Sequence, residues 1–245
     1  MVRRLIPVVA AALLFGVLGT VFFMTPRAAE NTAPAVAGYS VEGRPLEYWT
    51  FGQGSRVLFF MASIHGTEGA GTPLLEKLIE WLRANPGALE GKQVIVMPVA
   101  NPDGLQSGRR YNARGVDLNR NFPSQNRRDT SRFGTEAAPE PETVALVALL
   151  ERYRPAVTVS IHQPLECIDY DGPTEAAALA ERMAAACGLP VRKLGARQGS
   201  LGAWLGEDQQ RAVLTMELPA AVPPDHGRLW QLNGGALTAI IAGSE

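Results

Sequence analysis

Four apolar runs of strand length alternate along the chain with segments that have apolar residues at helical spacing. The runs are 57–64, 94–99, 156–161 and 212–216, and the helix-like segments are 73–82, 141–153 and 175–187. Short, continuous apolar runs are typical of strands buried on both faces, and their alternation with helices is typical of parallel sheets. We therefore expect a single α/β domain with a largely parallel sheet and helices on both faces.

Three side chains that can bind a metal or transfer a proton stand at the ends of these runs. His65 comes directly after the first run, His162 follows the third, and Glu217 follows the fourth. In open α/β sheets, binding sites form beyond the carboxyl ends of the parallel strands. The sequence therefore predicts that two imidazoles and one carboxylate meet at one edge of the sheet.

A metal site is the first interpretation of this pattern. His65 and Glu68 lie three residues apart on a predicted turn, close enough to share one cation, and His162 is a candidate third ligand. Two histidines and one glutamate with an open fourth position are a known arrangement for catalytic zinc. The alternative is that His162 is an ordinary polar residue at a strand end. The third histidine, His226, lies in a proline-rich segment and is interpreted as solvated surface.

Glu217 places a carboxylate at the end of an otherwise apolar strand. Burying a carboxylate without a partner is costly. A zinc-activated water is one such partner, because a carboxylate outside the coordination sphere can take its proton and pass it to a leaving nitrogen. The alternative is an ion pair between Glu217 and an arginine on a helix.

A segment rich in arginine follows a predicted turn at 101–104, which reads Asn-Pro-Asp-Gly. Its arginines stand at 109, 110, 114, 120, 127 and 128, and Asn, Gly and Asp are interleaved with them. This composition indicates a structured loop, and guanidinium groups suit the bidentate binding of carboxylates.

Five motifs together resemble the zinc carboxypeptidase family of the carboxypeptidase A type. They are His-x-x-Glu at 65–68, Asn-Pro-Asp-Gly at 101–104, Gly-Val-Asp-Leu-Asn-Arg-Asn-Phe-Pro at 115–123, Ser-Ile-His at 160–162 and Met-Glu-Leu at 216–218. Their order and spacing match across residues 55–219. The string at 110–123 and, less specifically, the stretch at 199–204 resemble the subgroup of bacterial murein tripeptide amidases. The resemblance implies a three-layer domain with a mixed, mostly parallel sheet.

The resemblance also implies roles for individual residues at a zinc centre. His65, Glu68 and His162 would bind one Zn²⁺, and Glu217 would act as general base and then as general acid. Arg110 would polarise the scissile carbonyl, with the adjacent Arg109 as a competitor for that role.

Substrate binding is the other role that the resemblance implies. Asn119 and Arg120 would hold the free carboxylate of the substrate. Carboxypeptidases of this family usually carry a mobile tyrosine about twenty residues before the catalytic glutamate, whereas this chain has no tyrosine after Tyr170. Arg197 or Gln198 stands in that region instead and is a candidate for contact with the substrate.

An acidic loop is expected at 169–173, on the same edge of the sheet. Asp169 and Asp171 are candidates to bind the amine of a diaminopimelate side chain. The expected function is a zinc-dependent metallopeptidase or amidase that hydrolyses the γ-D-glutamyl–meso-diaminopimelate bond of murein peptides. The alternatives are a metallocarboxypeptidase or deacylase acting on ordinary peptides or N-acyl amino acids, and a non-catalytic binding protein for wall peptides.

The start of the chain predicts export from the cytoplasm. Arg3 and Arg4 precede a run of twenty uncharged, mostly apolar residues at 5–24, about the length that crosses a bilayer as a helix. We interpret 1–29 as a signal peptide or signal anchor, 30–38 as a linker and 39–245 as the catalytic domain. The catalytic domain would then be extracytoplasmic (periplasmic), either secreted or anchored to the inner membrane if the segment is uncleaved.

Charge and cysteine content restrict the partners further. The net charge is −1, and the three arginines before residue 30 have no acid among them, so the remainder carries −1 − 3 = −4. This balance argues against a nucleic-acid partner. Cys167 and Cys187 would lie in an oxidising compartment, where one disulfide or two free thiols are both open. The sequence makes no prediction of oligomeric state.

Overall fold

A seven-stranded sheet forms the centre of the computed structural model, which describes residues 33–243. The strand order is β1-β2-β4-β3-β5-β7-β6. The strands are β1 (Ala35–Tyr39), β2 (Pro45–Phe51), β3 (Arg56–Ala62), β4 (Lys92–Met97), β5 (Val157–His162), β6 (Leu165–Asp171) and β7 (Ala212–Pro219).

The sheet is mixed, as expected, but only its centre is parallel. The strands β4, β3, β5 and β7 are parallel to one another, while β1 with β2, β2 with β4, and β6 with β7 form antiparallel pairs. Three parallel and three antiparallel pairs make the prediction of a mostly parallel sheet correct for the central strands only. The four apolar runs of the sequence correspond to these four parallel strands.

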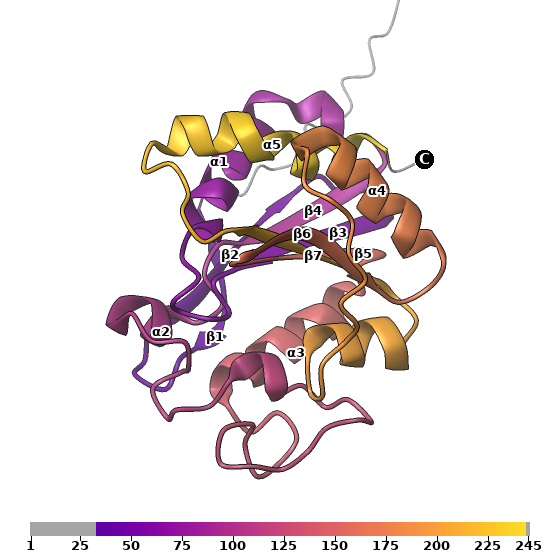
Figure 1. Cartoon of the computed structure of the whole chain (residues 1–245). Coiled ribbons are helices and arrows are strands. Elements are labelled where there is room, and N and C mark those ends of the chain that lie inside the picture. The colour runs from indigo at the N-terminus through magenta and orange to yellow at the C-terminus, as the bar shows by residue number, and fades with distance from the viewer. Residues whose placement is uncertain (1–32, 244–245) are drawn as a thin grey trace, which may run out of the picture.

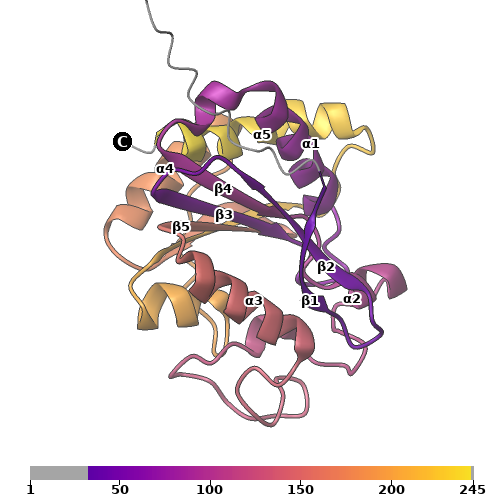
Figure 2. The same cartoon turned by 180° about the vertical axis from the view of Figure 1, so that it is seen from behind.

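Helices cover both faces of the sheet and complete the three layers (Figure 1). One face carries α1, α4 and α5, and the other carries α3 and a π-helical segment, η3; the short α2 lies beside β1 and β2, as the view from behind also shows (Figure 2). The bounds are α1 (Gly71–Ala84), α2 (Pro102–Ser107), α3 (Pro141–Tyr153), α4 (Glu175–Cys187), η3 (Gly202–Asp208) and α5 (His226–Ala242), with 3-10 turns η1 (Pro86–Leu89) and η2 (Leu118–Arg120).

Alternation along the central strands divides the core into two clusters, one on each face. On β3, Leu58 and Phe60 pack in the cluster under α1, α4 and α5, while Phe59 and Met61 pack in the cluster under α3 and η3. Because successive strand residues point to opposite faces, a continuous apolar run fills both clusters at once. This double burial is the physical reason that the four runs could be recognised in the sequence.

Two predicted connections are strands. Residues 35–38 of the predicted linker belong to β1, which packs against α3 with the Cα of Gly38 close to Ala145. The small residues of this strand allow that close approach. The acidic loop expected at 169–173 is also wrong in part, because Asp169 and Asp171 lie on β6, paired with β7.

The outer edge of β6 is partly covered by the segment 190–192. The backbone N–H of Ile168 donates to Pro190 O at 2.9 Å, and the N–H of Arg192 donates back to Ile168 O at 2.9 Å. Two backbone groups of an otherwise open edge strand are therefore paired.

Three further predictions concern the termini, the histidine of the proline-rich segment and the cysteines. The predicted signal segment, 1–29, lies outside the described residues; among residues 33–243 none of the helices has the length and apolar character to span a membrane.

His226 is exposed, as predicted, although it begins α5. Cys167 and Cys187 are both free thiols rather than a disulfide.

Candidate metal and active site

The turn after β3 positions His65 and Glu68. The N–H of Glu68 donates to His65 O at 3.0 Å and closes the turn. Gly66 packs directly on α2: an added Cβ would lie 2.0 Å from the carbonyl carbon of Gly104. Only glycine permits this approach, which holds the His65 and Glu68 side chains on one side of the turn.

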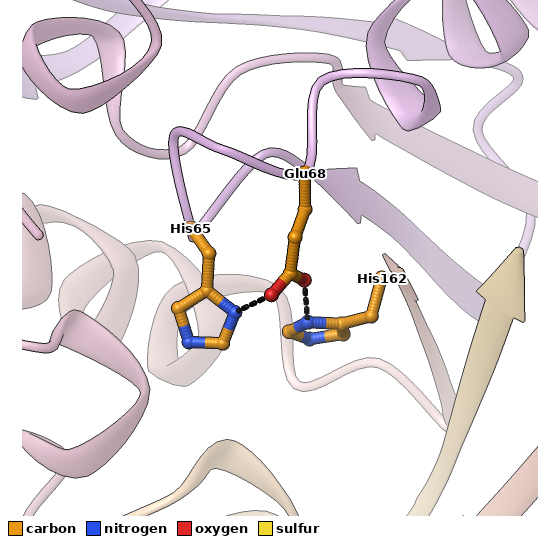
Figure 3. A group of neighbouring side chains, drawn as sticks. All are labelled: His65, Glu68 and His162. Carbon is orange, nitrogen blue, oxygen red and sulfur yellow. Dashed lines mark hydrogen bonds and ion pairs between the residues drawn. The ribbon is translucent and has the colours of Figure 1, made fainter. Parts of the chain in front are cut away.

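His162 enters the same space from β5, the strand next to β3. Figure 3 shows the Glu68 carboxylate between the two imidazole rings. Its Oε1 lies 2.9 Å from His65 Nδ1, and its Oε2 lies 2.8 Å from His162 Nδ1. All three side chains are buried, and one ligand atom from each lies within 4.8 Å of the others. The structure thus brings together the three predicted metal ligands.

These residues fit a zinc ion. Among residues 33–243, the buried Nδ1 of His65 contacts only the Glu68 carboxylate, at 2.9 Å and without ideal hydrogen-bond geometry, as expected for a nitrogen and a carboxylate that would share a cation. The outer nitrogens of both rings are held: His65 Nε2 lies 3.1 Å from Asp117 Oδ1, and His162 Nε2 lies 3.0 Å from Ser160 Oγ. Such outer partners orient metal-binding histidines, so both rings present Nδ1 to Glu68.

The charges around the three ligands favour a cation. Burial alone would raise the pKa of Glu68, but hydrogen bonds with His162 and His65 outweigh it and hold that pKa well below its ordinary value. Burial would also raise the pKa of Asp117, yet its hydrogen bond with His65 and the charge of Arg110 bring it to about 2. The Glu68 carboxylate is therefore ionised between the two rings, and the ionised Asp117 carboxylate lies behind His65.

Glu217 lies beside His162 because the two are register partners on β7 and β5. The side chain is 8% exposed, and its Oε2 accepts a hydrogen bond from the N–H of Leu165 at 3.3 Å. Burial raises its pKa, and the charge of Glu68 adds to this effect. Glu217 forms no ion pair with any residue in 33–243, so the alternative of a structural pair with a helix arginine is wrong.

Arg110, and not Arg109, reaches the site. The guanidinium of Arg110 donates to Glu68 Oε1 at 2.9 Å and to Asp117 Oδ2 at 3.2 Å, and its Nη2 lies 2.9 Å from His65 Nε2. Arg109 is exposed and does not line the cavity described below. Arg110 is therefore the one of the two arginines that lines the cavity, and its role towards the carbonyl stays a prediction.

Asn119 and Arg120 border the same site from η2. The Oδ1 of Asn119 accepts from the N–H of Leu201 at 3.0 Å, while its amide nitrogen has no hydrogen-bond partner within the described residues. Arg120 forms no ion pair there either. Burial lowers the pKa of Arg120, and the charges of Arg110 and Arg197 act in the same direction. A half-buried cation beside other cations favours an anionic ligand.

The three predicted metal ligands, Glu217, Arg110, Asn119 and Arg120 line one cavity of about 290 Å³. It lies on the α3 side of the sheet, where the alternate residues of β5 are the polar Thr158, Ser160 and His162. The segments 194–197 and 200–202 form another part of its wall. Sequence reasoning did not assign Ser160 or Asp117, although Ser160 stands two residues before His162 and hence on its face of the strand.

The two aspartates on β6 differ in their contacts. Asp171 is paired with Lys193, whose Nζ lies 2.8 Å from its Oδ1. Asp169 accepts a hydrogen bond from the N–H of Leu194 at 2.8 Å and has no ion-pair partner among residues 33–243. Asp169 therefore stays a candidate for binding a substrate amine, whereas Asp171 is already paired with Lys193.

Comparison with known proteins gives the class to which this site belongs. The zinc carboxypeptidase family profile matches residues 26–183, more than half of the chain. The chain belongs to the zinc carboxypeptidase family. It is thus a hydrolase of the metallopeptidase class, and zinc is its cofactor.

The curated relatives place it near one branch of that family. It is 34% identical over 216 residues to murein peptide amidase A of Escherichia coli strain K12, a match covering 79% of this chain and 86% of the relative. It is 35% identical over 215 residues to murein peptide amidase A of Vibrio campbellii, covering 80% and 83%. The crystal structure of murein-tripeptide amidase from Escherichia coli O157 superimposes with a TM-score of 0.70 at 28% identity, covering 88% of this chain and 94% of that one.

Proposed function

We propose that this enzyme hydrolyses the γ-D-glutamyl–meso-diaminopimelate bond of murein peptides. The observation that carries the proposal is a single cavity that joins the His65–Glu68–His162 group and Glu217 to Arg120, a cation with no ion pair to the described residues. A free carboxylate on the residue to be released satisfies that cation. The relatives named as murein peptide amidases support the choice of substrate.

His65, Glu68 and His162 would hold the zinc, which when bound lowers the pKa of a water molecule and polarises a carbonyl group. Glu217 takes a proton from the attacking water as general base and then delivers it to the leaving nitrogen. Its burial beside His162 suits this exchange, because a raised pKa brings a carboxylate nearer to the pKa that proton return requires.

Two further groups position and stabilise the substrate. The guanidinium of Arg110 stabilises the negative charge that develops on the carbonyl oxygen. Asn119 and Arg120 bind the terminal carboxylate and so set which peptide bond lies beside Glu217. Both assignments follow the positions of these side chains around the cavity.

We also propose that catalysis takes place outside the cytoplasm, where murein peptides are attached to the wall. The pattern of two arginines followed by an apolar run at 5–24 supports export.

The test is incubation of the zinc-loaded protein with L-Ala-γ-D-Glu-meso-diaminopimelate, followed by mass analysis of the products. We expect release of free diaminopimelate, and loss of at least about 100-fold in rate with Glu217→Gln at unchanged zinc content. Equal rates for the two proteins would overturn the role of Glu217. No release, together with release of C-terminal residues from ordinary peptides, would replace the murein substrate with the carboxypeptidase alternative.

A further inference from the structure

The cavity extends from Glu217 back along β6 and β7. Asp169 is the register partner of Thr215, and Asp171 is that of Val213, so these side chains face the cavity together. We call this part the inner end of the cavity. The segment 194–197 covers it, since the N–H of Leu194 is bonded to Asp169.

The inner end carries two charged groups that form no ion pair with any residue in 33–243. Asp169 has no ion pair, because the ammonium group of Lys193 is engaged by Asp171. The guanidinium of Arg197 makes no hydrogen bond or ion pair with any residue in 33–243, and it lines the same cavity. No ion pair joins Asp169 and Arg197 to each other. A pocket with one spare anion and one spare cation is complementary to a ligand that carries both charges.

The backbone beside Arg197 is well anchored although its side chain is exposed. The N–H of Ser200 donates to Arg197 O at 3.0 Å, and the N–H of Gly199 lies 3.1 Å from Ser124 Oγ. The loop therefore has a defined position relative to η2 and Arg120. The long side chain of Arg197 is free to reorient from this base towards a ligand.

We propose that Asp169 and Arg197 together bind the amino and carboxylate groups at the far end of the substrate's C-terminal side chain. The inference rests on the proposed function and names the part of the substrate that this end of the cavity recognises. Asp169 receives the ammonium group and Arg197 the carboxylate, while Arg120 remains for the carboxylate next to the scissile bond.

The charges of a diaminopimelate residue match this arrangement. At the end of a peptide it carries one carboxylate beside the scissile nitrogen, and one ammonium and one carboxylate at the far end of its side chain. The cavity offers a charge of opposite sign for each of these groups, on Arg120, Asp169 and Arg197, and none of the three forms an ion pair within residues 33–243. Asp171 and Lys193 take no part, because they neutralise each other.

The experiment uses four tripeptides that differ only in the third residue. Meso-diaminopimelate carries both distal groups, lysine only the amine, 2-aminopimelate only the carboxylate, and norleucine neither. The zinc-loaded enzyme, Arg197→Gln and Asp169→Asn are compared by kcat/KM. Arg192→Gln is the matched control, since Arg192 is an exposed arginine on the same segment that does not line the cavity.

The proposal expects a crossed pattern. Arg197→Gln lowers kcat/KM about tenfold or more for the diaminopimelate and 2-aminopimelate peptides and leaves the lysine and norleucine peptides unchanged. Asp169→Asn lowers it for the diaminopimelate and lysine peptides only. An equal loss on all four peptides, or no loss on any, would overturn the proposal, because a merely structural role cannot distinguish the distal groups.

A binding measurement separates this inference from the proposed function. If none of the peptides is cleaved, the proposed function fails, and calorimetric titration with free meso-diaminopimelate decides the inference instead. Binding that Arg197→Gln and Asp169→Asn each weaken about tenfold supports it. Absent binding, or equal affinity in all three proteins, overturns it.

Discussion

Asp117 and Ser160 hold the outer nitrogens of His65 and His162. An imidazole has two nitrogens, and a partner on one decides which tautomer and which ring orientation the other presents. The two rings therefore face Glu68 before any ion arrives, and binding a metal requires little rearrangement of side chains.

The clearest prediction for a single residue is the effect of replacing Arg120 on kcat/KM. We expect Arg120→Gln to lower kcat/KM about 10- to 100-fold on peptides with a free terminal carboxylate, because a charged hydrogen bond to the substrate is lost. Peptides with an amidated terminus are expected to show no such loss. Arg114→Gln is the control, since Arg114 is more exposed and lies 3.5 Å from Glu140. An equal loss on amidated peptides would contradict the assignment.

The lowered pKa of Asp103 lets us predict how the free energy of unfolding depends on pH. Burial would raise its pKa, but hydrogen bonds from Ser40, the backbone of Glu42 and Arg44 outweigh it and lower that pKa. A carboxyl whose folded pKa lies below its unfolded value of about 3.9 stabilises the fold above that pH, and the contribution disappears as the pH falls through the folded pKa.

We therefore expect Asp103→Asn to be less stable than the parent at neutral pH and to show a shallower decline on acidification. Urea unfolding across this range would measure both. A stability difference that stays constant from neutral pH to below the folded pKa would show that the carboxylate charge is not the cause.

The loop at 195–200 depends on Gly199 for its contact with η2. Gly199 has a φ of +68°, and an added Cβ would lie 2.1 Å from Arg120 O. We expect Gly199→Ala to displace Arg120 and to lower kcat/KM by up to about 100-fold, mostly through KM. Gly188→Ala is the matched control: its φ is +76°, but nothing lies within 4 Å of the added Cβ.

The left-handed backbone should cost each glycine variant about 1 kcal/mol of stability. Gly199→Ala should lose more because its added Cβ meets Arg120 O, and only Gly199→Ala should lose substrate affinity. Thermal unfolding and steady-state kinetics on both proteins would separate the two effects. A matching rise in KM for Gly188→Ala would argue against a specific contact with Arg120.

Elements buried on both faces could be predicted from the sequence, and the others could not. The bounds 141–153 and 175–187 agree with α3 and α4. The antiparallel strands β1, β2 and β6 were missed because their burial alternates or is incomplete. Asp169 and Asp171 led to the prediction of a loop, since Asp is rare in strands. In the structure both lie on β6 and face a polar cavity instead of the core.

The candidate site was predictable for a related reason. His65, His162 and Glu217 each follow an apolar run, and strand ends meet at one edge in a parallel sheet. The sequence could not show which aspartate of β6 is neutralised, because the partner, Lys193, is 22 residues away along the chain. Pairing between distant charges depends on the closed structure, and no local pattern reports it.

At the scale of the whole molecule, metal binding couples the site to stability. His65 and Glu68 follow β3 and His162 ends β5, so an ion bound by all three joins two neighbouring strands. Zinc that binds only the folded protein adds about 4 kcal/mol to the free energy of unfolding at a thousandfold excess over its Kd. We expect a chelator to abolish activity and to lower Tm, and added zinc to restore both.

Two variants make this prediction specific. Glu217→Gln should keep the rise in Tm with zinc while remaining inactive, because Glu217 is not in the ligand group. His162→Ala should lose the rise. A zinc-dependent Tm in His162→Ala equal to that of the parent would place the ion elsewhere.

The segment that partly covers the outer edge of β6 continues directly into the loop that carries Arg197. An unpaired edge strand invites pairing with another chain. Exchanging residues 190–198 to redirect the enzyme to other wall peptides would therefore alter two traits together, selectivity and resistance to aggregation. A protein engineer would retain the backbone pairing at 190–192 and vary only the positions from 194 onwards.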